Sequence, residues 1–213
     1  MFCLAACGGT TDIQVSTSTT SDVTTVATQI ETEKETVETA TEETAAETEV
    51  SDIEADDKVL VVYFSATGTT KGVAERIASI ENADLYEITA AQPYTSEDLD
   101  YGDSNSRTTI EQNDKNVRPE ISSDKLDLTG YTTIYVGYPI WWGEEPRIMD
   151  TFVESYDFGN ITMIPFCTSG GSGIGRSGSN LAENAGSGNW QSGERLQSSI
   201  SDEDLADWIN SYK

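Results

Sequence analysis

Beyond residue 57, stretches of consecutive apolar side chains alternate with stretches in which apolar side chains recur every three or four residues. Residues 59–64 read Val-Leu-Val-Val-Tyr-Phe, an unbroken run of β-branched and aromatic side chains. Such a run is typical of a strand buried on both faces of a parallel sheet. After a turn, Val73, Ile77 and Ile80 fall on one face of a helix. We therefore predict a strand, a turn and an amphipathic helix at the start of this region.

The same alternation continues to the carboxyl end. We predict strands over 83–88, 133–136 and 161–166, helices opening near Pro146 and spanning 176–185, and a short fifth strand around 190–196. A last helix follows Ser201-Asp202-Glu203-Asp204, which resembles a capping box. A polar stretch over 91–120 interrupts the pattern after the second strand. Alternating strands and helices predict an α/β fold with a doubly wound parallel sheet.

Composition divides the chain near residue 57. Residues 1–57 carry 14 acidic side chains and one basic one, and Phe2 is the only aromatic residue among them, out of 18 in the chain. Residues 8–57 are mostly Thr, Ser, Glu, Ala and Val, which offer too little apolar area to offset the entropy of ordering them. Frequent Thr disfavours the alternative of a solvated helix. We therefore expect a disordered tether over 8–57 and one folded domain over 58–213.

The first seven residues end in Leu4-Ala5-Ala6-Cys7, which resembles a bacterial lipobox. In that motif a signal peptidase cuts before the cysteine, and the cysteine then carries lipid. Residues 1–7 lack the basic start and the apolar run of roughly 7–15 residues of a full signal peptide, so we interpret them as the remnant of one. This interpretation predicts a lipoprotein held by Cys7 at the extracytoplasmic face of the cell membrane. If the likeness is accidental, we expect a cytoplasmic protein.

Charge and composition exclude several classes of function. The chain has 38 acidic and 12 basic side chains and a net charge of -26, so it lacks the excess of Lys and Arg that binding to nucleic acid or to an anionic membrane surface requires. It contains no histidine, which excludes Ser–His–Asp triads, Cys–His pairs and His-ligated zinc. Its three cysteines have no C-x-x-C spacing, so we expect neither a disulfide framework nor a metal site.

Three loops after predicted strands carry the candidate ligand-binding residues, because open α/β sheets bind ligands at the carboxyl ends of their strands. Residues 65–70 read Ser-Ala-Thr-Gly-Thr-Thr and lie between a buried strand and a helix start. Their hydroxyl groups and the free amides of the helix N-terminus favour a phosphate group. The spacing is not that of a Walker A loop, and ordinary capping of the helix by Ser or Thr is the alternative.

The other two loops suggest a flat ligand. Residues 139–143 read Pro-Ile-Trp-Trp-Gly, and an exposed indole there suits the face of an aromatic ring. The alternative is that one or both tryptophans anchor the loop to the core. Residues 168–176 are rich in glycine, which lets the backbone approach a ligand closely.

Together these motifs resemble those of flavodoxins, in particular a flavodoxin-like group with Pro-Ile-Trp-Trp-Gly in the second loop. The resemblance covers 58–213 and implies a five-stranded parallel sheet of order 2-1-3-4-5, with helices on both faces and FMN as the cofactor. It implies cofactor-binding roles for three sets of residues: Ser65, Ala66, Thr67, Gly68, Thr69 and Thr70; Pro139, Ile140, Trp141, Trp142 and Gly143; and Thr168, Ser169, Gly170 and Gly171.

The resemblance also implies how the three sets divide the cofactor. The first set holds the FMN phosphate, Trp141 or Trp142 stacks on the isoalloxazine ring, and the backbone of 168–171 faces its pyrimidine edge. Gly143 matches a position where flavodoxins can flip a peptide group toward the reduced flavin. The insertion over 91–120 adds four residues that could cover the flavin: Tyr94, Tyr101, Arg107 and Arg118. Its two arginines could also pair with the phosphate or a substrate, or form ion pairs with local acids.

We therefore expect an FMN-binding electron-transfer protein. Residues 58–213 hold 24 acidic and 11 basic side chains, so its expected partners are redox proteins with basic docking faces, or a small-molecule electron acceptor. One alternative is an FMN-dependent NAD(P)H:quinone-type oxidoreductase on the same fold. Another is a non-redox module that binds a different phosphorylated aromatic compound. The basic residues available for a nicotinamide site are Arg107, Arg118, Arg147 and Arg176.

Overall fold

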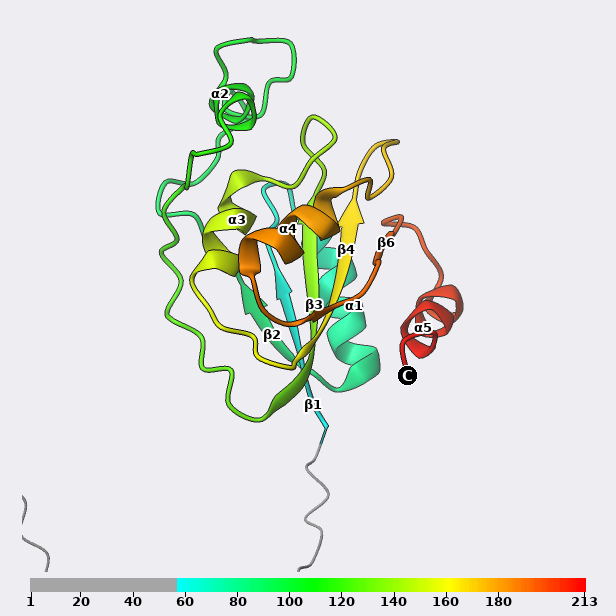
Figure 1. The fold of residues 1–213 in the computed structure, drawn as a ribbon. Helices are drawn as coiled ribbons and strands as arrows, with labels where there is room; N and C mark the ends of the chain where they lie inside the picture. The colour runs from blue at the N-terminus through cyan, green and yellow to red at the C-terminus, as the bar shows by residue number, and fades with distance from the viewer. Residues whose placement is uncertain (1–56) are drawn as a thin grey trace, which may run out of the picture. The chain divides into compact units, whose positions relative to one another are not determined.

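The computed structural model describes residues 57–213, in which strands and helices alternate (Figure 1). The strands are β1 (Lys58–Tyr63), β2 (Asp84–Glu87), β3 (Tyr131–Pro139), β4 (Thr162–Thr168), β5 (Asn189–Trp190) and β6 (Glu194–Arg195). The helices are α1 (Thr69–Glu81), α2 (Arg107–Asn113), α3 (Arg147–Glu154), α4 (Ser177–Ala185) and α5 (Asp202–Asn210). The predicted lipidation site Cys7, the segment 1–7 and the predicted tether up to residue 56 lie outside the described residues.

All strands are parallel, and the sheet has the order β2-β1-β3-β4-β5, with β6 also paired to β4. This order confirms the predicted topology, 2-1-3-4-5. The fifth position differs from the prediction, because two segments of two residues replace one strand. Pro165 lies between the β4 residues that pair with β5 and β6, and its missing N–H interrupts the hydrogen bonding. Gly193, between β5 and β6, passes beside Pro165 with φ 65. The two residues are so close that a Cβ on residue 193 would clash with the Pro165 carbonyl.

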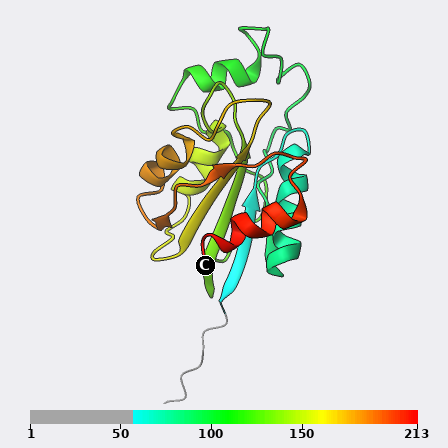
Figure 2. The same cartoon turned by 90° about the vertical axis from the view of Figure 1, so that its right-hand side faces the viewer.

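Each face of the sheet is covered by a pair of helices, as predicted (Figures 1 and 2). Side chains of a strand point alternately to opposite faces. In β1, Leu60 and Val62 pack into the core formed with α3 and α4, whereas Val61 and Tyr63 pack into the core formed with α1 and α5. This burial on both faces accounts for the unbroken apolar runs of the central strands. None of the helices in 57–213 has the length and apolar character needed to span a bilayer.

Several local predictions need correction. The polar stretch over 91–120 contains α2, which the hydrophobic pattern does not predict because its buried side chains are polar ones. In α1, Val73 and Ile77 of the predicted apolar face are buried, but Ile80 on the same face is 38% exposed. Only half of the predicted capping box forms. The Ser201 hydroxyl accepts a hydrogen bond from the Asp204 amide at 3.0 Å, as in a capping box. The Asp204 carboxylate, however, accepts a hydrogen bond from the Ser201 hydroxyl and not from the Ser201 amide.

Candidate functional site

The three loops predicted to bind a ligand meet at the carboxyl ends of β1, β3 and β4 (Figure 1). The Thr70 and Thr168 hydroxyl oxygens lie 2.8 Å apart, which joins the first loop to the third. The Ile140 amide donates to the Thr168 carbonyl at 2.9 Å, which joins the second loop to the third. The parallel topology therefore brings the predicted residues together on one side of the sheet.

The first loop presents an uncapped helix N-terminus. Gly68 is the N-cap of α1 and has φ 85, a left-handed conformation that glycine adopts without steric cost. It has no side chain to accept the first amides of the helix, so the alternative that Ser or Thr caps this helix is wrong. The first turn of α1 also contains no acidic residue. In so acidic a chain, this leaves the positive end of the helix dipole open to an anion.

The hydroxyl groups around this N-terminus fit a phosphate. Thr67 and Thr69 are exposed, with their hydroxyl oxygens 3.3 Å apart. The Ser65 hydroxyl is buried and has no hydrogen-bond partner in the part of the chain that the structure describes. A buried polar group without a partner is costly, and a ligand oxygen would satisfy it. Thr70 is buried and bonded to Thr168, so it joins the two loops.

The second loop is a tight turn with backbone strain. Trp141 and Glu144 exchange amide–carbonyl hydrogen bonds of 3.0 Å across it. The two residues between them, Trp142 and Gly143, have φ 48 and φ 84. Positive φ at both central positions defines a type I′ turn, in which Asn-Gly is the favoured pair. A tryptophan in this conformation is strained, and such strain concentrates at functional sites.

The two tryptophans have different environments. Trp141 is 3% exposed, and its ring packs edge-on against Phe64 at 5.6 Å and Tyr94 at 5.1 Å between centroids. Trp142 is 40% exposed, with its ring 4.4 Å from that of Tyr101. Trp141 therefore anchors the loop to the core, and Trp142 is the candidate for stacking on a ligand.

The third loop offers exposed backbone. Gly170 and Gly171 are exposed, whereas Thr168 is buried at its start. The Ser169 hydroxyl donates to the Ser172 carbonyl and accepts the Gly171 amide at 3.3 Å, so this side chain shapes the loop. The polar groups that the third loop can give to a ligand are thus mainly those of its glycine backbone.

Comparison with known proteins identifies the family of this chain. Residues 58–212 match a family model whose description is flavodoxin. The chain belongs to the flavodoxin family. Two solved flavoproteins from Bacteroides eggerthii and Bacteroides uniformis share 43% and 44% identity, each with a TM-score of 0.68, and the matches cover 72% of this chain and 96% and 97% of theirs. A flavoprotein from Lactobacillus acidophilus NCFM, solved in complex with FMN, shares 26% identity with a TM-score of 0.53 over 72% of this chain and 99% of its own. No curated protein matches.

In this flavodoxin, the insertion packs over the second loop mainly through aromatic contacts. Tyr101 lies against Trp142, and Tyr94 lies against Trp141. Arg107 sits 3.9 Å above the Tyr94 ring and bonds the Glu111 carboxylate at 2.7 Å. Arg118 bonds the Glu154 carboxylate at 2.6 Å. The two arginines therefore form the ion pairs expected as the alternative to ligand binding, and Tyr101 is the insertion residue at the exposed side of the turn.

The sequence did not predict a buried charged cluster directly after this flavodoxin's second loop. Glu145, Arg147 and Asp150 are 1%, 3% and 1% exposed, and the Arg147 guanidinium lies 3.7 Å from the Glu145 carboxylate and 3.5 Å from that of Asp150. Burial raises the pKa of the Glu145 carboxyl to about 7, although Asn180 and Arg147 favour its charged form. A run of charges at a helix start usually indicates a solvated surface, so the sequence contained no signal for this cluster.

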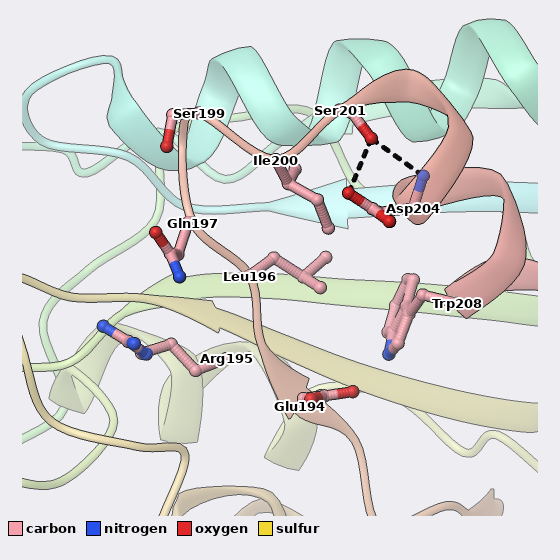
Figure 3. Close-up of a pocket in the computed structure, with 9 residues that line it drawn as sticks. All are labelled: Glu194, Arg195, Leu196, Gln197, Ser199, Ile200, Ser201, Asp204 and Trp208. Atoms are coloured by element: carbon pink, nitrogen blue, oxygen red, sulfur yellow. Dashed lines mark hydrogen bonds between the residues drawn. The ribbon is translucent and has the colours of Figure 1, made fainter.

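A separate hollow lies away from the predicted site, between the segment 194–201 and α5 (Figure 3). Its volume is about 530 Å³, and Leu196, Ile200 and Trp208 supply its apolar wall. None of the three predicted loops contributes to its lining. This hollow is therefore not part of the candidate site of this flavodoxin, which the three loops form.

Proposed function

We propose that this protein binds FMN at the three loops and transfers electrons. FMN is the cofactor indicated by membership of the flavodoxin family and by the relative solved with FMN. The observation that carries the proposal is the α1 N-terminus, which has no side-chain cap and no acidic residue in its first turn. It is flanked by the Ser65 hydroxyl, which has no hydrogen-bond partner within residues 57–213. An anion with several oxygens, such as the FMN phosphate, fits these donors.

We assign each part of FMN to the loop residues whose side chains or backbone are exposed, or whose polar groups have no partner among the described residues. Ser65, Thr67 and Thr69 would donate hydroxyl groups to the phosphate, together with the amides of α1. The exposed indole of Trp142 would cover a face of the flavin, and the backbone of Gly170 and Gly171 would bond its polar edge. When bound, FMN supplies the electron transfer through its isoalloxazine ring, while the protein supplies binding, orientation and electrostatics.

The acidic domain supports a particular kind of partner. Its excess of negative charge would disfavour added charge on the flavin and would attract proteins with basic docking faces. We therefore expect electron transfer with such partners at rates that fall as salt concentration rises. A small-molecule electron acceptor is the other expected partner. A nicotinamide site finds less support, because three of its four candidate residues, Arg107, Arg118 and Arg147, are engaged in ion pairs.

The first test is the visible spectrum of residues 57–213 after mixing with FMN and gel filtration. We expect a yellow protein with one FMN per chain; a colourless protein would refute both FMN-dependent functions and leave the non-redox binding module. Stopped-flow mixing of the yellow protein with NADH or NADPH then separates the other two. Slow reduction is expected for a carrier, and rapid bleaching would instead identify the NAD(P)H:quinone-type reductase.

We further propose that the protein belongs to the flavodoxin-like group with Pro-Ile-Trp-Trp-Gly in its second loop, and that it is a lipoprotein anchored through Cys7. The anchor proposal rests on Leu4-Ala5-Ala6-Cys7 and the Thr- and Glu-rich segment after it. Growing cells that express the full chain with a radioactive fatty acid should label the parent protein and not the Cys7→Ser variant. An unlabelled parent would refute the anchor.

A further inference from the structure

The strained turn of the second loop is held at its base by a side chain from the insertion. The turn leaves the core at the Trp141 carbonyl and returns to it at the Glu145 carbonyl. The Gln112 side-chain nitrogen, from α2, lies 3.0 Å from the first of these oxygens and 3.1 Å from the second. A carboxamide nitrogen has two hydrogens, so Gln112 donates one to each side of the turn.

The same residue is fixed from the opposite direction. Its main-chain carbonyl accepts the Arg147 guanidinium at 3.1 Å, and Arg147 also bonds the Glu144 carboxylate at 2.6 Å. Gln112 is 9% exposed, so these bonds are shielded from water. Figures 1 and 2 show α2 beyond the carboxyl end of the sheet, where it lies over this loop. The end of α2 is thus joined both to the turn and to the start of α3.

Gln112 holds this position at a cost to its own hydrogen bonding. Its side-chain oxygen is buried and has no partner among the described residues. Buried carboxamides normally satisfy both ends, so the unpaired oxygen indicates that the donor end determines the placement of this side chain. The turn that it holds contains Trp142 at φ 48, a conformation that a type II turn, with a negative φ at that position, would relieve.

We propose that Gln112 is a positioning residue that keeps the Trp142–Gly143 turn in its strained form and thereby sets the redox potential of FMN. The inference rests on the proposed function, because the turn lies beside the flavin only if FMN occupies the three loops. Turning the peptide groups and the indole next to the flavin changes the dipoles that it meets, and these dipoles favour one oxidation state over the other.

The test replaces Gln112 with Met, which keeps the length of the side chain and removes both donors. In the FMN-free protein, the Trp141 and Glu144 amides that close the turn should exchange their hydrogens at least about tenfold faster. In the loaded protein, the ratio of FMN dissociation constants between the oxidised and the two-electron-reduced state should change by about tenfold, equal to about 30 mV. Asn113→Ala, which removes an exposed carboxamide one residue away, should change neither quantity.

The outcomes separate the inference from the proposed function. Unchanged exchange would overturn the positioning role, and a potential within a few millivolts of the parent would overturn the effect of the turn on the flavin. If the parent binds no FMN, the proposed function fails and the redox part of the inference fails with it, while amide exchange still decides whether Gln112 holds the turn. If the Met variant does not fold, Gln112→Glu keeps the volume and points a carboxylate at the two carbonyl oxygens, and the same changes are expected of it.

Discussion

Replacing Thr67 and Thr69 together with Ala should weaken FMN binding by about 10²- to 10⁴-fold and leave riboflavin binding almost unchanged. Both hydroxyl groups are exposed at the α1 N-terminus, and Gly68 between them caps no amide. A hydrogen bond to a charged group is worth about 1.5–3 kcal/mol, and each 1.4 kcal/mol is a factor of about ten in affinity. Riboflavin has no phosphate and therefore cannot use these bonds.

The measurement is a titration of each flavin into the protein, followed by the quenching of flavin fluorescence. Thr89→Ala is the matched control, because Thr89 is also exposed but lies outside the three loops. Its affinity for both flavins should equal that of the parent. If the double variant lost riboflavin as severely as FMN, the hydroxyls would be shaping the loop, and the phosphate would have to be assigned elsewhere.

The second large effect concerns Glu145. Relative to the parent, the Glu145→Gln variant should gain about 2–3 kcal/mol in the free energy of unfolding between pH 4 and pH 8. Burial raises the pKa of this carboxyl from 4.5 to about 7 in the folded state. Between those values the folded protein binds more protons than the unfolded chain, so the contribution of Glu145 to stability falls as pH rises. A glutamine does not titrate and escapes this loss.

Urea unfolding of both proteins at four or five pH values measures the difference between their free energies of unfolding. The contributions of the other acidic residues, which both proteins share, largely cancel in this difference. The groups that face Glu145 belong to three elements: Arg147 and Asp150 from α3, Asn180 from α4, and the Tyr138 hydroxyl from β3. Glu120→Gln, at an exposed position outside the helices and strands, is the control and should show a difference from the parent that changes little with pH. A Glu145→Gln difference that stays constant with pH would mean that the pKa of Glu145 is the same in the folded and unfolded states, and burial would then not raise it.

The sequence predicts the strands and helices of this protein well where burial on both faces of the sheet requires apolar side chains. The central strands are buried on both faces, so their apolar runs are unambiguous, and the strand–turn–helix order then brings the three loops to one side of the sheet. It does not predict α2, because that helix buries Thr108, Glu111 and Gln112 instead of apolar side chains. The division of the fifth strand depends on how Gly193 meets Pro165, a contact between segments far apart in the chain.

The site shows the same division between local pattern and tertiary contact. The residue types of the phosphate loop can be recognised from sequence, since hydroxyls and a glycine before a helix have a local physical meaning. The roles of Trp141 and Trp142 cannot, because the residues are identical and adjacent, and the turn alone decides which indole is buried. The burial of Glu145 and Arg147 likewise depends on α2 and α4 packing over a helix start that has the composition of a surface.

The division of the fifth strand also bears on self-association. A sheet edge recruits a strand from another molecule when it presents a continuous row of free N–H and C=O groups. Here one edge consists of two segments of two residues, separated where Gly193 crosses Pro165. The opposite edge is β2, a strand of four residues that begins at Asp84 and ends at Glu87. The carboxylates of these two residues form ion pairs with Lys58 and Lys71, respectively. Growth of the sheet from one molecule into the next is therefore disfavoured at both edges.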